Sequence, residues 1–266
     1  MTDPSAGRWN DLRTRVISAV VMLAVGVVDI WAGGVPFAAL IIVLTGLLVW
    51  ELMMMTGART PLLAIIVAIV AAAMLMASLM LDWPARTSLL ALPLGLIWFA
   101  ARRDALIAVL YGAAILTAGF GLIALRNDAG MVTLIWLIGV VVVSDVAGYF
   151  AGRTLGGPKF WPAISPKKTW SGTVAGWLGA ALVGLGFVVY GSAGWGLIVL
   201  SALVSFAGQM GDIAESWIKR RAGVKDSSHL IPGHGGVLDR FDAVIGAVVA
   251  VIVLGLIWSL PLPTGA

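Results

Sequence analysis

The sequence contains no cysteine among its 266 residues, which excludes disulfides, thiolate metal ligands and cysteine nucleophiles. It contains only two histidines, so the usual ligands of zinc are scarce as well. Charged residues make up 11% of the chain and hydrophobic residues 61%, which leaves too little polar surface for a soluble domain. The phosphate-binding motif GxxxxGK[ST] is also absent, so the chain is not a soluble-type nucleoside triphosphatase.

The chain contains several long apolar runs. Its mean hydropathy is +1.04, and a helix that spans a bilayer needs roughly 20 apolar residues. The first run follows three arginines, as in a signal peptide, but no hydrophilic mature domain comes after it, so we expect a retained helix. The sequence predicts about nine spans, at approximately residues 16–34, 36–55, 61–81, 88–101, 104–125, 130–151, 173–190, 194–214 and 242–260. The fourth is short and contains Pro93, and whether it crosses fully is left open.

The distribution of cations favours an N-terminus in the cytoplasm. Lysine and arginine in short loops concentrate on the cytoplasmic side of a membrane. With nine spans and the N-terminus inside, 15 of the 17 cations fall inside, and only Arg86 and Arg126 fall outside. We therefore predict an all-α integral membrane protein whose C-terminus lies on the side opposite the N-terminus.

The polar residues divide the chain into two parts. Residues 1–125 hold few intramembrane polar groups, with Asp29 and Glu51 as exceptions, and all of the lysines follow residue 126. We expect residues 1–125 to be transmembrane scaffold helices and residues 126–266 to be a catalytic transmembrane region with a site at the cytoplasmic face. The two parts are expected to form one integrated membrane unit.

The densest polar segment runs from Ser216 to Asp242 and holds five cations, both histidines and four glycines in 27 residues. The helix that leads into it carries side chains at i, i+3, i+4, i+7 and i+8, which share one face: Asp212, Glu215, Ser216, Lys219 and Arg220. Ionisable groups at the end of a span need a partner, water or a ligand. The alternative to a binding face is a ladder of internal ion pairs that fixes the helix.

The loop from Lys225 to Asp242 contains the glycine-rich corner 232–236, PGHGG. Glycine permits a backbone whose amides approach an anion closely. Asp239 and Asp242 are three residues apart, so on a first helical turn their carboxylates converge on a point suited to a hard divalent cation. The alternative is that one of them is the N-cap of the last span.

Two earlier segments add polar groups. Asp145, Tyr149 and Arg153 share a helical face, and Gly148 and Gly152 form a small-residue pair that lets a second helix approach. An aspartate at that depth is a functional candidate, with structural pairing to Arg153 as the alternative.

The other early segment is the sequence SPKKTWSG, residues 165–172, which places Lys167, Lys168 and Thr169 at the membrane surface. The alternative is a positively charged anchor, with Trp170 in the interfacial belt.

Carboxylates bind Mg²⁺, and lysine and arginine bind phosphates, so these clusters predict phosphoryl or nucleotidyl transfer. Two other classes stay open. One is a membrane transporter, which would carry its charges near the midplane. The other is a different lipid phosphotransferase or kinase, although the pattern Asp-Gly-x-x-Ala-Arg of CDP-alcohol phosphotransferases is absent.

The Ser216–Asp242 segment resembles the signature of the phosphatidate cytidylyltransferase (CDP-diacylglycerol synthase) family. The matching positions are Ser216, Lys219, Arg220, Lys225, Asp226, Pro232, Gly233, His234, Gly235, Gly236, Asp239, Arg240 and Asp242. The segments around Asp145 and Lys167 also look like motifs of this family, so the resemblance covers residues 126–245. Two positions depart from the usual pattern: Ser171 stands where an acid is common, and Ala243 where a serine is common.

The resemblance implies transfer of the cytidylyl group of CTP to phosphatidic acid, giving CDP-diacylglycerol and pyrophosphate, with Mg²⁺ required and a second cation left open. Carried over to this sequence, the catalytic residues are Lys219, Arg220, Lys225, Asp226, Asp239 and Asp242. The substrate-binding residues are Lys167, Lys168, Thr169, Ser216, His234, Gly235, Gly236 and Arg240, with a purely structural role of His234 as the alternative. The metal ligands are Asp212, Asp239 and Asp242, followed by Asp145 and Glu215.

The expected surroundings of the protein follow from the same implication. We expect it in a bacterial inner membrane with its site facing the cytoplasm, and with CTP, phosphatidic acid and the bilayer as partners. Nucleic acid is not expected as a partner. The small-residue faces are compatible with a homodimer and equally with packing inside one chain. Acyl-chain preference and the choice between CTP and dCTP are not encoded in any motif that we recognise.

Overall fold

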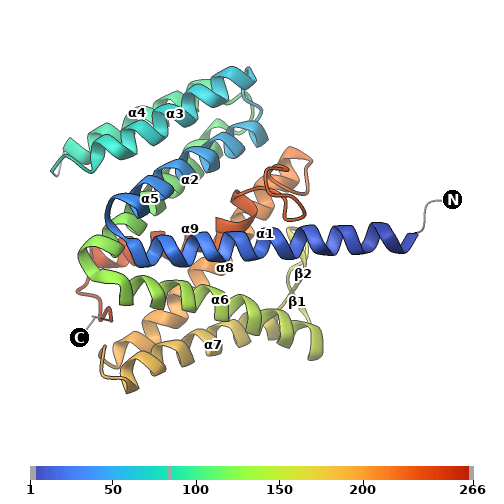
Figure 1. Cartoon of the computed structure of the whole chain (residues 1–266), viewed down its shortest axis with the longest axis vertical. Helices are drawn as coiled ribbons and strands as arrows, with labels where there is room; N and C mark the ends of the chain where they lie inside the picture. The colour runs from blue at the N-terminus through green and yellow to red at the C-terminus, as the bar shows by residue number, and fades with distance from the viewer. Residues whose placement is uncertain (1–3, 83–84, 264–266) are drawn as a thin grey trace.

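The computed structural model describes residues 4–82 and 85–263, and within them the chain is mostly helical (Figure 1). The first half contains α1 (Pro4–Ala32), α2 (Gly34–Met55), α3 (Pro61–Ser78), α4 (Ala85–Ala100) and α5 (Ala105–Ala124). A five-residue π-helix, η1 (Leu125–Ala129), joins α5 to α6 (Gly130–Thr154). Two short strands, β1 (Lys159–Trp161) and β2 (Ser165–Thr169), precede α7 (Trp170–Val189), α8 (Gly196–Ala222) and α9 (Leu238–Gly255).

The α-helices of the described residues lie close to the nine predicted spans, but fewer of them qualify as membrane spans. Six stretches are long and apolar enough to cross a membrane: α1 from Thr14, α2, α3, the continuous stretch Ala105–Thr154, α7 and α8. Helix α4 has only 16 residues, and α9 carries three charged residues in its first turns. The count of nine spans therefore stays a prediction. The chain ends, whose sides of the membrane were predicted, lie outside the described residues.

The all-α expectation missed a short strand in the segment 165–169. It forms β2, which pairs antiparallel with β1, with Lys159 opposite Thr169 and Trp161 opposite Ser165. The rings of Phe160 and Trp170 pack edge to face across the hairpin, with centroids 4.7 Å apart. Strands this short and polar carry too few alternating apolar residues to be recognised from the sequence.

The helices pack in a continuous order from α4 through α3, α2, α5, α9, α8 and α7 to α6. Glycines allow the closest approaches. A Cβ on Gly246 of α9 would overlap the backbone of Ala207 in α8, and a Cβ on Gly148 of α6 would lie 3.1 Å from the carbonyl oxygen of Gly172 in α7. The prediction that Gly148 and Gly152 let another helix approach is confirmed, because both face the start of α7.

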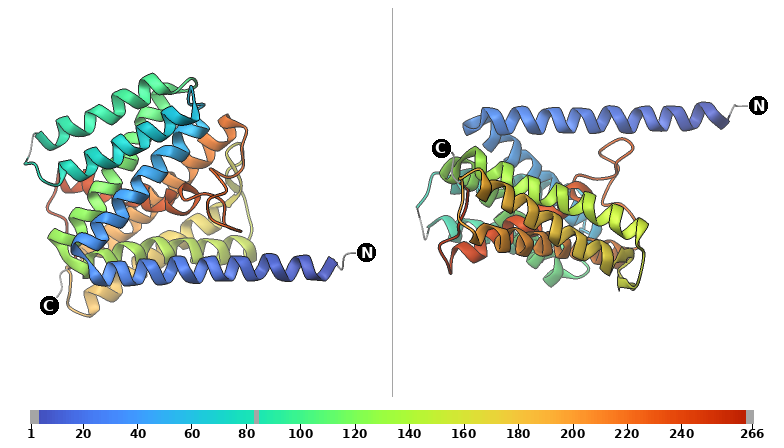
Figure 2. Two further views of the ribbon diagram at one scale, coloured as in Figure 1. Left: turned by 45° about the horizontal axis from the view of Figure 1, so that its top comes forward. Right: turned by 90° about the horizontal axis from the view of Figure 1, so that it is seen from below.

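Helix α1 lies along one side of the bundle and is set apart from most of it (Figure 2). Its apolar stretch Thr14–Ala32 has no residue buried inside the protein. Near its end, the side chain of Arg126 donates hydrogen bonds to the carbonyl oxygens of Ile30 (2.8 Å) and Trp31 (3.4 Å). Arg126 therefore caps the last carbonyls of α1 and ties them to η1.

Candidate active site

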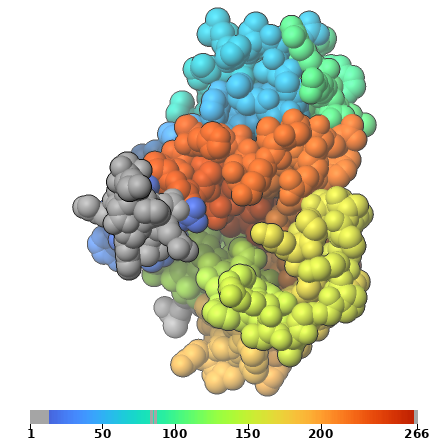
Figure 3. Space-filling model, turned by 90° about the vertical axis from the view of Figure 1, so that its right-hand side faces the viewer, coloured from blue at the N-terminus to red at the C-terminus, as the bar shows by residue number. Residues whose placement is uncertain are grey.

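A pocket of about 470 Å³ opens between α6, the hairpin, the start of α7, and α8. Figure 3 shows the surface hollowed between the yellow-green, yellow and orange segments that contain these elements. The pocket is lined by Ser144, Asp145, Gly148, Tyr149, Gly152, Arg153, Ser165, Lys167, Lys168, Thr169, Gly172, Gln209 and Asp212. Three polar segments that lie far apart in the sequence therefore meet in one cavity.

Lys168 and Asp212 form an ion pair across this pocket. The Nζ atom of Lys168 lies 2.8 Å from Oδ2 of Asp212 and 3.3 Å from the carbonyl oxygen of Gln209. Asp145, which is exposed to the pocket, lies within electrostatic range of both Lys168 and Asp212. Asp145 therefore lies near Asp212, and its alternative partner Arg153 forms no ion pair with any described residue.

Thr169 lines the pocket but also has a local structural role. Its side chain accepts a hydrogen bond from the backbone N–H of Gly172 (3.2 Å), so it is the N-cap of α7. Ser171, at the position where an acid is common, donates a hydrogen bond to the carbonyl oxygen of Gly156. The serine therefore contacts the backbone just before the hairpin rather than a cation.

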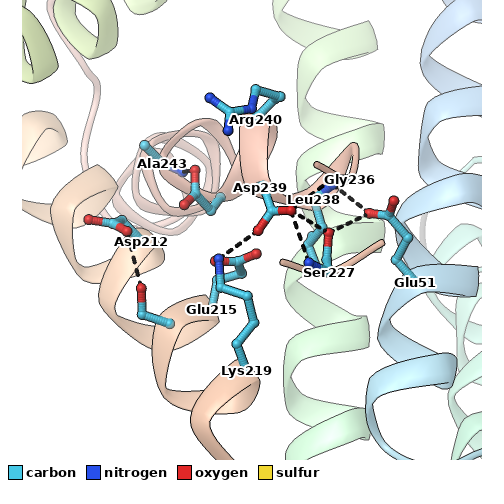
Figure 4. A network of polar contacts seen from close by, with 12 residues as sticks. Glu51, Asp212, Glu215, Lys219, Ser227, Gly236, Leu238, Asp239, Arg240 and Ala243 are labelled. Carbon is cyan, nitrogen blue, oxygen red and sulfur yellow. Dashed lines mark hydrogen bonds and ion pairs between the residues drawn. The ribbon is translucent and has the colours of Figure 1, made fainter. Parts of the chain in front are cut away.

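A second polar cluster lies beside the pocket, at the junction of α8 and α9 (Figure 4). Lys219 lies between two carboxylates, in an ion pair with Glu215 and 2.6 Å from Oδ1 of Asp239. The side chain of Glu215 is completely buried and that of Asp239 is 5% exposed. The ion-pair ladder considered as an alternative is thus present between Glu215 and Lys219, whereas Asp212 pairs with Lys168.

Asp239 lies in the first turn of α9, before the apolar part of that helix. Its Oδ2 accepts hydrogen bonds from the backbone N–H of Ser227 (2.9 Å), the hydroxyl of Ser227 (3.0 Å) and the backbone N–H of Gly236 (2.8 Å). Burial favours the neutral acid, but the hydrogen bonds from Lys219, Gly236 and Ser227 outweigh burial and lower the pKa of Asp239 to about 2. Asp239 therefore stays ionised and holds the two ends of the loop 227–236 together.

Glu51 of α2 also holds this loop, and the sequence did not indicate that role. The side chain is fully buried and accepts four hydrogen bonds. The hydroxyls of Ser227 (3.1 Å) and Ser228 (2.5 Å) and the backbone N–H groups of Val237 (2.9 Å) and Leu238 (2.6 Å) are the donors. The glycine-rich corner was expected to direct its amides at a substrate anion, yet the N–H of Gly236 donates to the carboxylate of Asp239 and that of His234 to the carbonyl oxygen of Ile231.

The contacts at the start of α9 also test the alternative that Asp239 or Asp242 is the N-cap of this helix. Asp239 and Asp242 both lie inside α9, and Oδ1 of Asp242 accepts from the backbone N–H of Ala243 (2.8 Å). Neither residue is the N-cap, so that alternative was wrong. Glu51 satisfies the first free N–H groups of α9 from a different helix, since unpaired amides at a buried helix start need an acceptor. The available signal in the sequence was a lone acid in an otherwise apolar helix.

The remaining signature residues lie around the loop and outside the pocket lining. His234 Nδ1 is 2.8 Å from the hydroxyl of Ser18 in α1, and Arg240 Nη2 donates to the carbonyl oxygen of His234 (2.9 Å). Ser216 donates a long hydrogen bond (3.4 Å) to Oδ1 of Asp212. Arg220, Lys225 and Arg240 are exposed, while Asp226 and Gly235 are half-buried. Gly236 is buried against Ser227 and Glu51, with no room for a Cβ.

The five predicted metal ligands are not equally available. Asp239 and Glu215 are engaged by Lys219. Asp145, Asp212 and Asp242 lie within electrostatic range of one another. Among the described residues, no three acids or histidines are already gathered as a metal-binding group. Asp212 is itself paired with Lys168, so a cation bound there would have to displace that lysine. These three aspartates offer only oxygen donors, which suits a hard cation such as Mg²⁺.

Comparison with known proteins follows this geometry. The family model described as "Cytidylyltransferase family" matches residues 13–258. A protein of Brucella suis named phosphatidate cytidylyltransferase is 35% identical over 265 residues, which cover 95% of this chain and 96% of the relative. A protein of Staphylococcus saprophyticus with the same name is 41% identical over 47% of this chain and 49% of its own length. One of Helicobacter pylori is also 41% identical, over 51% of each chain. The chain therefore belongs to the cytidylyltransferase family.

Proposed function

We propose that this chain transfers the cytidylyl group of CTP to phosphatidic acid and releases CDP-diacylglycerol and pyrophosphate. It belongs to the cytidylyltransferase family over nearly its whole length, and its relatives carry the name of this activity. The observation that carries the assignment to a site is the pocket in which Asp145, Lys168 and Asp212 meet. That pocket combines carboxylates with cations, as transfer between phosphate groups requires.

The chemistry needs no nucleophile from the enzyme, because the lipid provides one. An oxygen of the phosphatidate phosphate attacks the α-phosphorus of CTP, a new P–O bond forms, and the bond between the α-phosphorus and the bridging oxygen of pyrophosphate breaks. The protein contributes position and charge stabilisation. Lys168 and the exposed Lys167 are the pocket cations of β2, and they would neutralise the triphosphate as it enters.

Oxygen donors suit Mg²⁺, and fewer residues would bind it than the sequence suggested. Asp145, Asp212 and Asp242 would hold the ion, whose charge neutralises phosphate oxygens when it is bound. Glu215 and Asp239 would instead fix Lys219 and the loop. This division rests on accessibility: the side chains of Glu215 and Asp239 are buried against Lys219, whereas Asp145 and Asp212 line the pocket.

The location that we propose is a bacterial plasma membrane, with the pocket open to the cytoplasm. Six apolar stretches support an integral membrane protein. The excess of cations on the predicted inner side supports a cytoplasmic pocket, where CTP is available while the diacyl chains of the other substrate stay in the bilayer. A homodimer stays a proposal that sedimentation in detergent would test.

The first test is purified protein in mixed micelles with CTP, phosphatidic acid and Mg²⁺. We expect lipid-dependent release of pyrophosphate from the wild type. Asp242→Asn removes a charge from the proposed metal ligands and is expected to lower kcat by about 100-fold or more, since electrostatic groups at such sites contribute on that order. Thermal unfolding in detergent should be close to that of the wild type.

Asp82→Asn is the matched control, because Asp82 is exposed and does not line the pocket. It should retain wild-type turnover. Near-normal activity of Asp242→Asn would remove Asp242 from the site, and a folded wild type that releases no pyrophosphate would refute the proposed function.

A further inference from the structure

The outer face of α6 is apolar for most of its length and becomes polar at one end. Val142, Val146 and Phe150 are 53%, 50% and 60% exposed. They lie along the same side of the helix as Tyr149 and Arg153, because residues four and seven apart in a helix share a face. The rise of 1.5 Å per residue places Arg153 about 16 Å along the axis from Val142. An apolar surface thus leads from the membrane to the rim of the pocket.

Arg153 is held at that rim by its neighbour on the helix. Its Nη1 donates a hydrogen bond to the hydroxyl of Tyr149 (2.7 Å), and its guanidinium lies 6.0 Å from the centroid of the tyrosine ring. Both residues line the pocket. Arg153 forms no ion pair with any described residue. Its charge is oriented, accessible and uncompensated.

The other cations at the pocket are differently placed. Lys168 is paired with Asp212, and Lys167 lies on the hairpin rather than on α6. Arg153 is therefore the pocket cation that joins the lipid-facing surface. A planar guanidinium also binds a phosphate through two parallel hydrogen bonds, which an ammonium group cannot do.

We propose that Arg153, positioned by Tyr149, binds the phosphate group of the phosphatidic acid substrate, with the acyl chains lying along Val142, Val146 and Phe150. The nucleotide then occupies the part of the pocket near Lys168 and Asp212. This assignment rests on the proposed function.

The test is the steady-state kinetics of Arg153→Ala in mixed micelles, with the surface fraction of phosphatidic acid and the concentration of CTP varied separately. We expect the KM for phosphatidic acid to rise about tenfold or more, since a charge-assisted phosphate contact is lost. The KM for CTP should change by less than about twofold. Arg153→Lys should recover only part of the loss, because it restores the charge without the planar pair of donors.

Tyr149→Phe and Arg102→Ala complete the series. Tyr149→Phe keeps the ring and removes the hydroxyl that orients Arg153, so it should raise the KM for phosphatidic acid by a smaller factor. Arg102 is exposed and lies outside the pocket, so Arg102→Ala controls for a general loss of positive charge.

An unchanged KM for phosphatidic acid in Arg153→Ala, or equal increases in both KM values, would overturn the lipid subsite while the wild type remains active. If Arg153→Ala does not fold, an unchanged KM for phosphatidic acid, or equal increases in both KM values, in Arg153→Lys and Tyr149→Phe would overturn the lipid subsite instead. A wild type without lipid-dependent activity would instead overturn the proposed function, and this inference with it.

Discussion

Glu51→Gln is expected to destabilise the protein and to lower its activity strongly, although the change replaces one oxygen by a nitrogen. All four partners of Glu51 are donors: two serine hydroxyls and the backbone N–H groups of Val237 and Leu238. Val237 donates to Oε1 and Leu238 to Oε2. A glutamine NH₂ therefore faces a backbone donor in either orientation of the amide.

A buried donor left without an acceptor costs about 1–3 kcal/mol. The expected results are a lower melting temperature in detergent and a loss of turnover, because the loop 227–236 and the start of α9 shift together. Glu51→Ala, which removes all four contacts, should be worse.

Two controls separate this effect from a general disturbance of α2. Ser228→Ala removes one of the four donors and should cost less than Glu51→Gln. Thr45→Ala removes a buried hydroxyl of the same helix whose hydrogen bond goes to its own backbone, at Ile41, and should leave turnover near that of the wild type. If Glu51→Gln behaves like Thr45→Ala, Glu51 does not position the loop.

Lys219→Met is expected to have the largest effect on stability. Lys219 is 13% exposed and lies between the buried carboxylates of Glu215 and Asp239. Among the described residues, Lys219 is the only cation in an ion pair with these two buried acids. Removing it leaves negative charges without compensation, which costs about 3–5 kcal/mol. Thermal unfolding in detergent and the yield of folded protein measure this loss.

The double variant Lys219→Met with Glu215→Gln tests the cause. It removes one of the two uncompensated charges, so it should recover part of the stability lost in Lys219→Met. Lys219→Met with wild-type stability would show that the ion pairs contribute little, and Lys219 would then be free to act on substrate as the sequence suggested.

Hydropathy was sufficient to predict the positions of the helices, because an apolar run of helical length in a bilayer has few other solutions. The hairpin at 159–169 was missed, since its residues have neither length nor alternation. Two of the predicted spans lack the features of a membrane-crossing helix, because α4 is short and α9 begins with charged residues.

The sequence predicted which residues belong to the site better than it predicted which of them contact one another. Spacing alone joined Asp212 to Glu215 and Lys219, but it could not show that Asp212 pairs with Lys168, 44 residues earlier in the chain. Asp239 and Asp242 were taken as equivalent because they are three residues apart. Their surroundings differ, since loop amides surround Asp239 while Asp242 lies near Asp212 and Asp145. Such differences arise from tertiary contacts, which local patterns do not encode.

The hydrogen bond between Glu51 and Leu238 joins residues 187 positions apart, and this separation has a consequence for biosynthesis. A ribosome that makes the chain from its N-terminus produces α2 early and the serines and amides that meet Glu51 only near the end. Until then the acid has none of these four donors, in a helix that is otherwise apolar. The signature loop can therefore close on Glu51 only after the start of α9 has been made, and a nascent chain interrupted before α9 would lack both the closed loop and Asp242.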